Sequence, residues 1–137
     1  MEYSVTQMFD LVEQVEHYPR FLPWCGSTEI HARNSETTLA SIEIDYHRVK
    51  QSFTTRNVKC APHSIEIRLE RGPFRTLEGL WRFSALGDGA CKVEFSLSYE
   101  FSSKLLETLI GPVFENIAGT LLESFIQRAE AVYDAKR

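Results

Sequence analysis

The sequence lacks the positive charge and the paired cysteines that define several protein classes. Its 15 Lys and Arg residues are outnumbered by 19 Asp and Glu residues, giving a formal net charge of -4. This balance argues against a general nucleic-acid binder, which carries a basic footprint. The three cysteines, Cys25, Cys60 and Cys91, are far apart and form no CxxC or Cys/His cluster. They indicate neither a disulfide framework nor a metal site, and they favour a reducing compartment, the cytoplasm.

Targeting segments and catalytic motifs are also missing. The first ten residues contain neither a basic nor an apolar stretch, so no signal peptide is visible, and we expect no apolar run long enough to span a membrane. There is no GxSxG, HExxH, P-loop or dinucleotide-binding motif, and the four histidines show no ligand spacing. We therefore expect a non-enzymatic protein that requires no cofactor.

A long amphipathic stretch at residues 103–134 is the strongest positive signal. Apolar side chains recur there at helical spacing, namely Leu106, Ile110, Val113, Ile117, Leu121 and Phe125. A helix with so broad an apolar face must cover a large apolar surface, which we expect the preceding chain to supply as a sheet. Pro112, which follows Gly111, removes a helical hydrogen bond and predicts a kink or a break.

The N-terminal part predicts a second, shorter helix followed by an irregular segment. Residues 4–13 place apolar side chains on one helical face, and Ser4 or Thr6 is a suitable N-cap. Pro19 and Pro23 then prevent a regular helix in a segment rich in large apolar side chains. Two interpretations remain for this segment: a short helix or turn that covers an opening, or a loop that packs on the core.

From residue 27 onward the hydrophobic period changes from helical to alternating, which predicts strands. The alternating runs are 29–33, 40–46, 48–57, 65–70, 79–83 and 93–101. Short turn signals separate them, so we expect an antiparallel meander with one wet and one apolar face. The 137 residues thus form a single α+β domain, a curved sheet around the C-terminal helix.

The apolar face of this sheet carries more polar side chains than a solid core accepts. Tyr46, Gln51, Thr55, Asn57 and Tyr99 lie on it by alternation. A mostly apolar pocket with a few polar groups is the usual form of a small-molecule site, so we expect a cavity between sheet and helix. The alternative is that these residues lie near strand ends and meet water.

Two segments also carry a family resemblance. The residues YSVTQMFDLVEQVEHYPRFLPWC at 3–25 and SFIQRAEAVYD at 124–134 resemble the coenzyme Q-binding START-like family, which includes ribosome-association toxins and belongs to the polyketide cyclase/dehydrase superfamily. The resemblance implies a START/Bet v 1-like helix-grip fold that holds ubiquinone or a related polyprenyl lipid in a tunnel. One departure is that members of the family usually have a strand before the element that begins here at residue 3, and the sequence leaves no room for it. Three explanations remain: a misassigned start, a trimmed chain or a lost strand. An open sheet edge makes a monomer or weak dimer the expected state.

On this basis we expect the tunnel to be lined by aromatic and aliphatic side chains, with a few polar groups for a quinone head and the irregular segment as its lid. The predicted ligand-binding residues are Tyr18, Phe21, Trp24, Tyr46, Gln51, Phe53, Thr55, Asn57, Trp81, Phe83, Phe95, Tyr99, Val113, Phe114 and Ile117. A lipid carrier of this kind would be cytoplasmic, with transient contact to the inner-membrane surface.

The toxin branch implies a different function, in which the protein binds the large ribosomal subunit and hinders subunit joining. Positive side chains on two predicted hairpins could meet phosphates, and they are Arg48, Lys50, Arg56, Lys59, Arg68, Arg71 and Arg75. Neighbouring acidic residues would partly neutralise them, as on any solvated face. A cyclase/dehydrase-like enzyme is the third alternative, implied by the superfamily alone.

Overall fold

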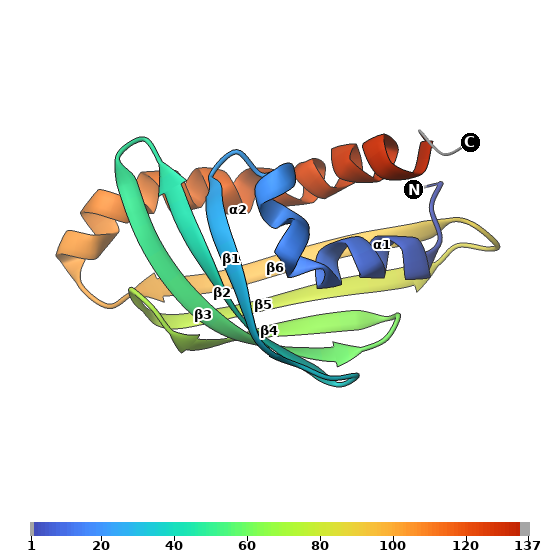
Figure 1. Cartoon of the computed structure of the whole chain (residues 1–137), viewed down its shortest axis with the longest axis horizontal. Helices are drawn as coiled ribbons and strands as arrows, with labels where there is room; N and C mark the ends of the chain where they lie inside the picture. The colour runs from blue at the N-terminus through green and yellow to red at the C-terminus, as the bar shows by residue number, and fades with distance from the viewer. Residues whose placement is uncertain (1, 135–137) are drawn as a thin grey trace.

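The structure is a computed structural model that describes residues 2–134. Its elements follow in the order α1 (Val5–Glu13), the 3₁₀-helix η1 (Val15–Arg20), β1 (Cys25–Arg33), β2 (Thr37–Tyr46), β3 (Val49–Cys60), β4 (Ser64–Arg71), β5 (Phe74–Ala85), β6 (Cys91–Phe101) and α2 (Lys104–Tyr133). The expected order of helix, irregular segment, six strands and long helix is confirmed. The sheet is curved, and α2 runs along it and passes α1 and η1 in its second half (Figure 1).

The sheet is an antiparallel meander in which every strand pairs with its neighbour in the chain, in the order β1-β2-β3-β4-β5-β6. Its register brings apolar side chains of successive strands into rows. Ile65 on β4 lies opposite Trp81 on β5, which lies opposite Phe95 on β6. Within residues 2–134 no strand precedes α1, so β6 forms one edge of the sheet.

Helix α1 starts where the sequence predicts it. The Ser4 hydroxyl accepts a hydrogen bond from the Gln7 backbone N–H, and the Gln7 side chain accepts one from the Ser4 N–H, which completes a capping box. Met8 and Val12 of this helix are buried. The two ends of the chain then meet, because the Tyr133 hydroxyl at the end of α2 donates to the Gln7 carbonyl at 2.8 Å.

A kink or a break was expected at Pro112; helix α2 is continuous over 30 residues, so the break is wrong, and the kink stays a prediction. Proline within a helix costs about 3 kcal/mol or more. Its ring here points to solvent, while Ile110 and Phe114 on either side are buried against the sheet. Burial of two large apolar side chains is worth about 1.5–3 kcal/mol each, which offsets the cost of the proline.

From the sequence we expected no segment long and apolar enough to span a membrane, but by length and composition alone helix α2 meets that description. The same signal arises from a helix whose apolar face covers a sheet. Phe114, Ile117, Phe125 and Ala129 lie on such a buried face, so the helix is part of the core in this structure.

Candidate ligand-binding cavity

The concave face of the sheet and α2 enclose a cavity with about 70 Å³ of water-accessible volume. Side chains from η1, five strands and α2 line it. Nine of the residues predicted from the sequence are among them: Tyr18, Trp24, Phe53, Thr55, Asn57, Trp81, Phe95, Phe114 and Ile117. The alternation of the strands and the helical period of α2 therefore found most of the aromatic wall.

The other six predicted residues lie elsewhere. Phe83 packs against Phe9 of α1, with ring centroids 5.8 Å apart. Tyr99 packs edge-on against Phe114, with ring centroids 4.6 Å apart. The remaining four also fall outside the lining, namely Phe21, Tyr46, Gln51 and Val113. Strand alternation gives the face of a side chain but not its position along the strand, and Tyr46 and Gln51 lie toward the β2–β3 turn.

The cavity also has lining residues that the sequence analysis did not select. They are the aliphatic side chains Val15, Ile42, Ile67, Leu77, Leu97, Ala118 and Leu121. Ile42, Ile67, Leu97, Ala118 and Leu121 lie on the predicted inner face of their strand or helix, so the periodicity contained the signal for these five. Val15 and Leu77 lie outside the predicted elements. Aliphatic side chains of this kind are as common in a solid core as in a cavity wall, so their residue type alone does not mark a binding site.

Two nitrogen donors in the lining have no hydrogen-bond partner among the residues that the structure describes. The Thr55 hydroxyl donates to Asn57 Oδ1 at 3.0 Å, which leaves the Asn57 amide N–H groups free. The indole N–H of Trp81, a nearly fully buried residue, also has no partner. The cavity lining contains no carboxylate, Lys, Arg or His. Its chemistry therefore suits an uncharged, mostly apolar molecule that carries an acceptor oxygen.

The 3₁₀-helix η1 closes one end of this cavity through Val15 and Tyr18. The Tyr18 hydroxyl does not face the ligand space as a free donor, because it donates to the Val12 carbonyl. Burial raises the pKa of Tyr18 far above its ordinary value, so its phenol stays neutral. The irregular segment thus contains a short helix that packs on the core, and its role as a lid stays a prediction.

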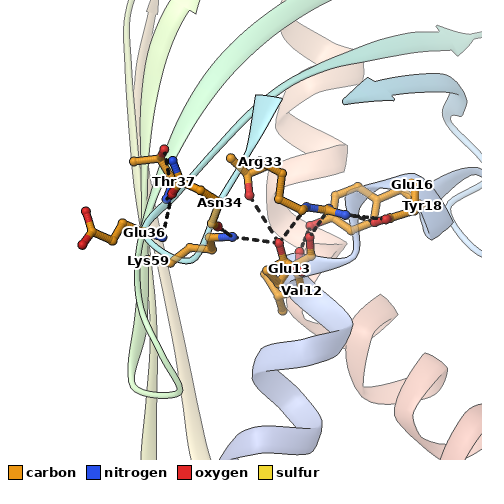
Figure 2. Close-up of polar contacts among 10 residues, drawn as sticks. Val12, Glu13, Glu16, Tyr18, Arg33, Asn34, Glu36, Thr37 and Lys59 are labelled. Carbon is orange, nitrogen blue, oxygen red and sulfur yellow. Dashed lines mark hydrogen bonds and ion pairs between the residues drawn. The ribbon is translucent and has the colours of Figure 1, made fainter. Parts of the chain in front are cut away.

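A cluster of four charged residues, the Glu13 cluster (Glu13, Glu16, Arg33 and Lys59), fixes η1 to the sheet (Figure 2). Glu13 Oε1 lies 3.0 Å from both Arg33 Nε and Lys59 Nζ. Arg33 Nη1 also lies 2.6 Å from Glu16 Oε2, and this hydrogen bond is the main reason that the pKa of Glu16 is lowered. The chain leading into Tyr18 is therefore anchored to β1 and β3.

The same cluster corrects one assignment in the predicted basic set. The sequence predicts that Lys59 belongs to the same phosphate-binding set as Arg48, Lys50 and Arg56. In the structure its side chain is only 6% exposed and pairs with Glu13. It lies on the inner face of β3, the face to which alternation assigns the odd-numbered residues of this strand. Lys59 is therefore not available to an external partner in this structure.

The remaining basic residues are on the convex side or in turns, and most have acidic partners. Arg56 and Arg68 are directly opposite in the β3–β4 register. Each also has a carboxylate neighbour, Glu70 at 3.6 Å and Glu66 at 2.9 Å respectively. The other predicted members are all exposed, namely Arg48, Lys50, Arg71 and Arg75, of which Arg75 pairs with Glu100 at 3.1 Å. Among the described residues, Arg48, Lys50 and Arg71 have no ion pair.

A curved antiparallel sheet that grips a long C-terminal helix over an apolar cavity defines the START-like class of proteins. The sequence places the chain within that class: it belongs to the polyketide cyclase/dehydrase and lipid transport family, whose profile matches residues 1–126.

Two kinds of relative stand out among similar sequences. The ribosome association toxin RatA of Pseudomonas aeruginosa is 38% identical over 133 residues, which cover 97% of this chain and 92% of the relative. The mitochondrial coenzyme Q-binding protein COQ10 homolog B of Xenopus laevis is 27% identical over 135 residues, covering 96% of this chain and 55% of the relative. Both branches expected from the sequence are therefore represented.

Solved structures agree on the fold. An 18 kDa protein from Caulobacter crescentus superposes with a TM-score of 0.71 at 30% identity, covering 98% of this chain and 93% of that one. The Zhui aromatase/cyclase from a Streptomyces species reaches a TM-score of 0.81, with coverage of 94% and 88%, at only 15% identity. The second likeness shows the shared helix-grip fold alone.

Proposed function

We propose that this protein binds an uncharged hydrophobic ligand, ubiquinone or a related polyprenyl lipid, in the cavity between the sheet and α2, without catalysing its conversion. The observation that carries the proposal is the chemistry of the lining. It is aromatic and aliphatic, free of ionisable groups apart from the neutral phenol of Tyr18, and supplied with two unpartnered N–H donors at Asn57 and Trp81. Those donors match the carbonyl oxygens of a quinone head, and an isoprenoid tail needs only apolar wall.

The volume of the cavity sets a condition on this binding. Drug-sized ligands occupy pockets of about 300–1,000 Å³, whereas the present cavity holds about 70 Å³ of water-accessible space. A quinone therefore requires α2 and the half-buried side chains beneath it, such as Leu121, to move outward. Ligand loading is then coupled to displacement of the helix.

The test is native mass spectrometry with solvent extraction on protein purified from its own cells. A co-purifying quinone near one equivalent is expected, and Ala118→Leu should reduce it strongly because the larger side chain fills the cavity. Gly119→Leu is the matched control, since a Cβ there meets nothing within 4 Å. Asn57→Leu should retain the fold and weaken binding of the quinone head. An empty protein that also rejects added quinone would overturn the proposal.

A second function, association with the large ribosomal subunit, is favoured by one specific observation. The relatives with 38% identity over nearly the whole chain are named ribosome association toxins. On this chain the exposed cations Arg48 and Lys50 near the β2–β3 turn, with Arg56 on β3, form the surface that we assign to rRNA phosphates. The cavity and this convex surface are separate, so one protein can perform both functions.

Charge reversal separates the two functions. Changing Arg48, Lys50 and Arg56 together to glutamate should abolish co-sedimentation with large subunits and leave quinone binding intact. The matched control reverses Arg75, Arg82 and Lys92, three exposed cations on β5 and β6. Equal co-sedimentation of both triple variants and the original protein would exclude this surface. A cytoplasmic location with transient contact to the inner membrane remains a prediction of the carrier function.

A further inference from the structure

A second hollow lies on the outer side of η1, between α1, η1 and the last turns of α2. It has about 350 Å³ of water-accessible volume and a polar wall that includes Gln14, His17, Arg20 and Arg128. The cavity described above is on the other side of the same 3₁₀-helix, which contributes Val15 and Tyr18 to it. Neither proposed function uses this outer cleft.

Arg128 is held at the cleft in an unusual way for a surface arginine. Its guanidinium carbon lies 5.0 Å from the centroid of the Phe21 ring. The Phe21 ring in turn packs on the buried Phe125, with centroids 5.2 Å apart. The Arg128 Nε is buried and has no hydrogen-bond partner. No carboxylate among the described residues forms an ion pair with Arg128, so the aromatic ring orients a guanidinium whose donors are unused.

The cleft joins the two sequence elements that carry the family resemblance. Phe21 belongs to the YPRFLPWC element, and Phe125 and Arg128 belong to the SFIQRA element near the C-terminus. The contact between Arg128 and Phe21 is the point at which these elements meet outside the core. The cavity accounts for the aromatic residues of the two elements, but it does not account for the arginine.

The charge of the cleft is positive, in a chain whose net charge is -4. Arg20 and Arg128 contribute two guanidinium groups to its wall, and the imidazole of His17 lies beside them. Among the described residues of the wall, Asp10 is the only acidic one, and burial, followed by the nearby Glu13 carboxylate, raises its pKa. By contrast, Arg33 on the opposite side of η1 is neutralised by Glu13 and Glu16.

We propose that this cleft binds a small phosphate-bearing molecule. A planar guanidinium presents paired N–H donors that match two phosphate oxygens, and it is held here by cation–π contact before any ligand arrives. Further donors for a third oxygen and for a second phosphate come from Arg20, His17 and the Gln14 amide. The volume is within the range of small-ligand pockets, and the site lies between three helical segments, which suits a compact anion.

The experiment is calorimetric titration of the whole protein with pyrophosphate and with inorganic phosphate at low ionic strength. Arg128→Gln should weaken pyrophosphate binding by tenfold to about a hundredfold, the loss expected for charge-assisted hydrogen bonds. Arg20→Gln should weaken it to a smaller extent. Arg82→Gln, an exposed arginine on the convex face, is the matched control and should bind as the original protein does.

Each other outcome has a defined meaning. Arg128→Gln loses a ring contact, so its melting temperature is measured beside the affinity, and the exposed Arg20 variant provides a test that does not depend on that contact. Absence of millimolar or tighter pyrophosphate binding overturns the proposal, as does an equal effect of all three variants. Binding of a short RNA that depends on Arg128, without pyrophosphate binding, would reassign the cleft to the nucleic-acid backbone. Ala118→Leu should leave pyrophosphate affinity unchanged, which separates this site from the hydrophobic cavity.

Discussion

The Glu13 cluster permits a quantitative prediction for the substitution Glu13→Gln. Lys59 is only 6% exposed, and its ammonium group has two acceptors, Glu13 Oε1 at 3.0 Å and the Asn34 carbonyl at 2.8 Å. Breaking a buried ion pair by removing one partner costs about 3–5 kcal/mol. The cost is lower here because Glu13 and Arg33 are 18% and 29% exposed and Arg33 retains Glu16. We expect a loss of about 2–3 kcal/mol in the free energy of unfolding.

That loss converts into a measurable shift of the melting temperature. With an unfolding entropy of about 2 cal/mol/K per residue, a chain of 137 residues should melt about 7–10 °C lower in the Glu13→Gln variant. The assay is thermal unfolding followed by circular dichroism, with urea unfolding as a second measure.

The control and the refuting result follow from the same cluster. Glu29→Gln removes an equal charge from an exposed strand position and should shift the melting temperature by less than about 2 °C. Adding Lys59→Met to Glu13→Gln should recover part of the loss, because the buried ammonium is then gone. If Glu13→Gln has the same melting temperature as the Glu29→Gln control, the view that this cluster anchors η1 is refuted.

Three further predictions concern the core, α2 and the thiols. Phe125→Ala should cost about 3–5 kcal/mol, seen as a lower urea midpoint, since Phe125 is fully buried among aromatic rings. Pro112→Ala should raise the melting temperature by several degrees, because alanine restores the helical hydrogen bond. Burial, aided by Glu43, raises the pKa of Cys25 from 9.0 to about 12. The stability that its neutral thiol contributes is therefore present below pH 9 and lost as the pH rises toward 12. Over this range the urea midpoint of the original protein should fall more than that of Cys25→Ala. Iodoacetamide should label exposed Cys60 before Cys25.

Most of the fold was predictable because two different hydrophobic periods divide the chain. The alternation between residues 29 and 101 fixed six strands, and the helical period after residue 103 fixed the long helix. Helix continuity through Pro112 was not predictable from a local rule, because the opposing energy comes from Ile110 and Phe114 against a sheet built from distant residues. Tertiary burial outweighed the local preference.

The candidate site was predictable in its faces and less so in its positions. The alternation of side chains along the strand alone predicts that Thr55 and Asn57 lie on the inner face, and both line the cavity. Tyr46 and Gln51 have the same parity but lie farther along the strands, beyond the part that α2 and η1 enclose. Lys59 also has inner-face parity, and its burial depends on Glu13, 46 positions earlier. No local pattern in the sequence links two residues so far apart.

The order of the strands has a consequence for how the chain is made. Because every strand pairs with its neighbour in sequence, the sheet can form hairpin by hairpin as the chain emerges during synthesis. The helix that covers the concave face follows all six strands in the chain and can dock only after the whole sheet exists. For that interval the aromatic wall of Trp81, Phe95 and their neighbours faces solvent. The nascent protein therefore passes through a stage in which it is prone to aggregate, and an apolar ligand or a chaperone that occupies the open face would protect it.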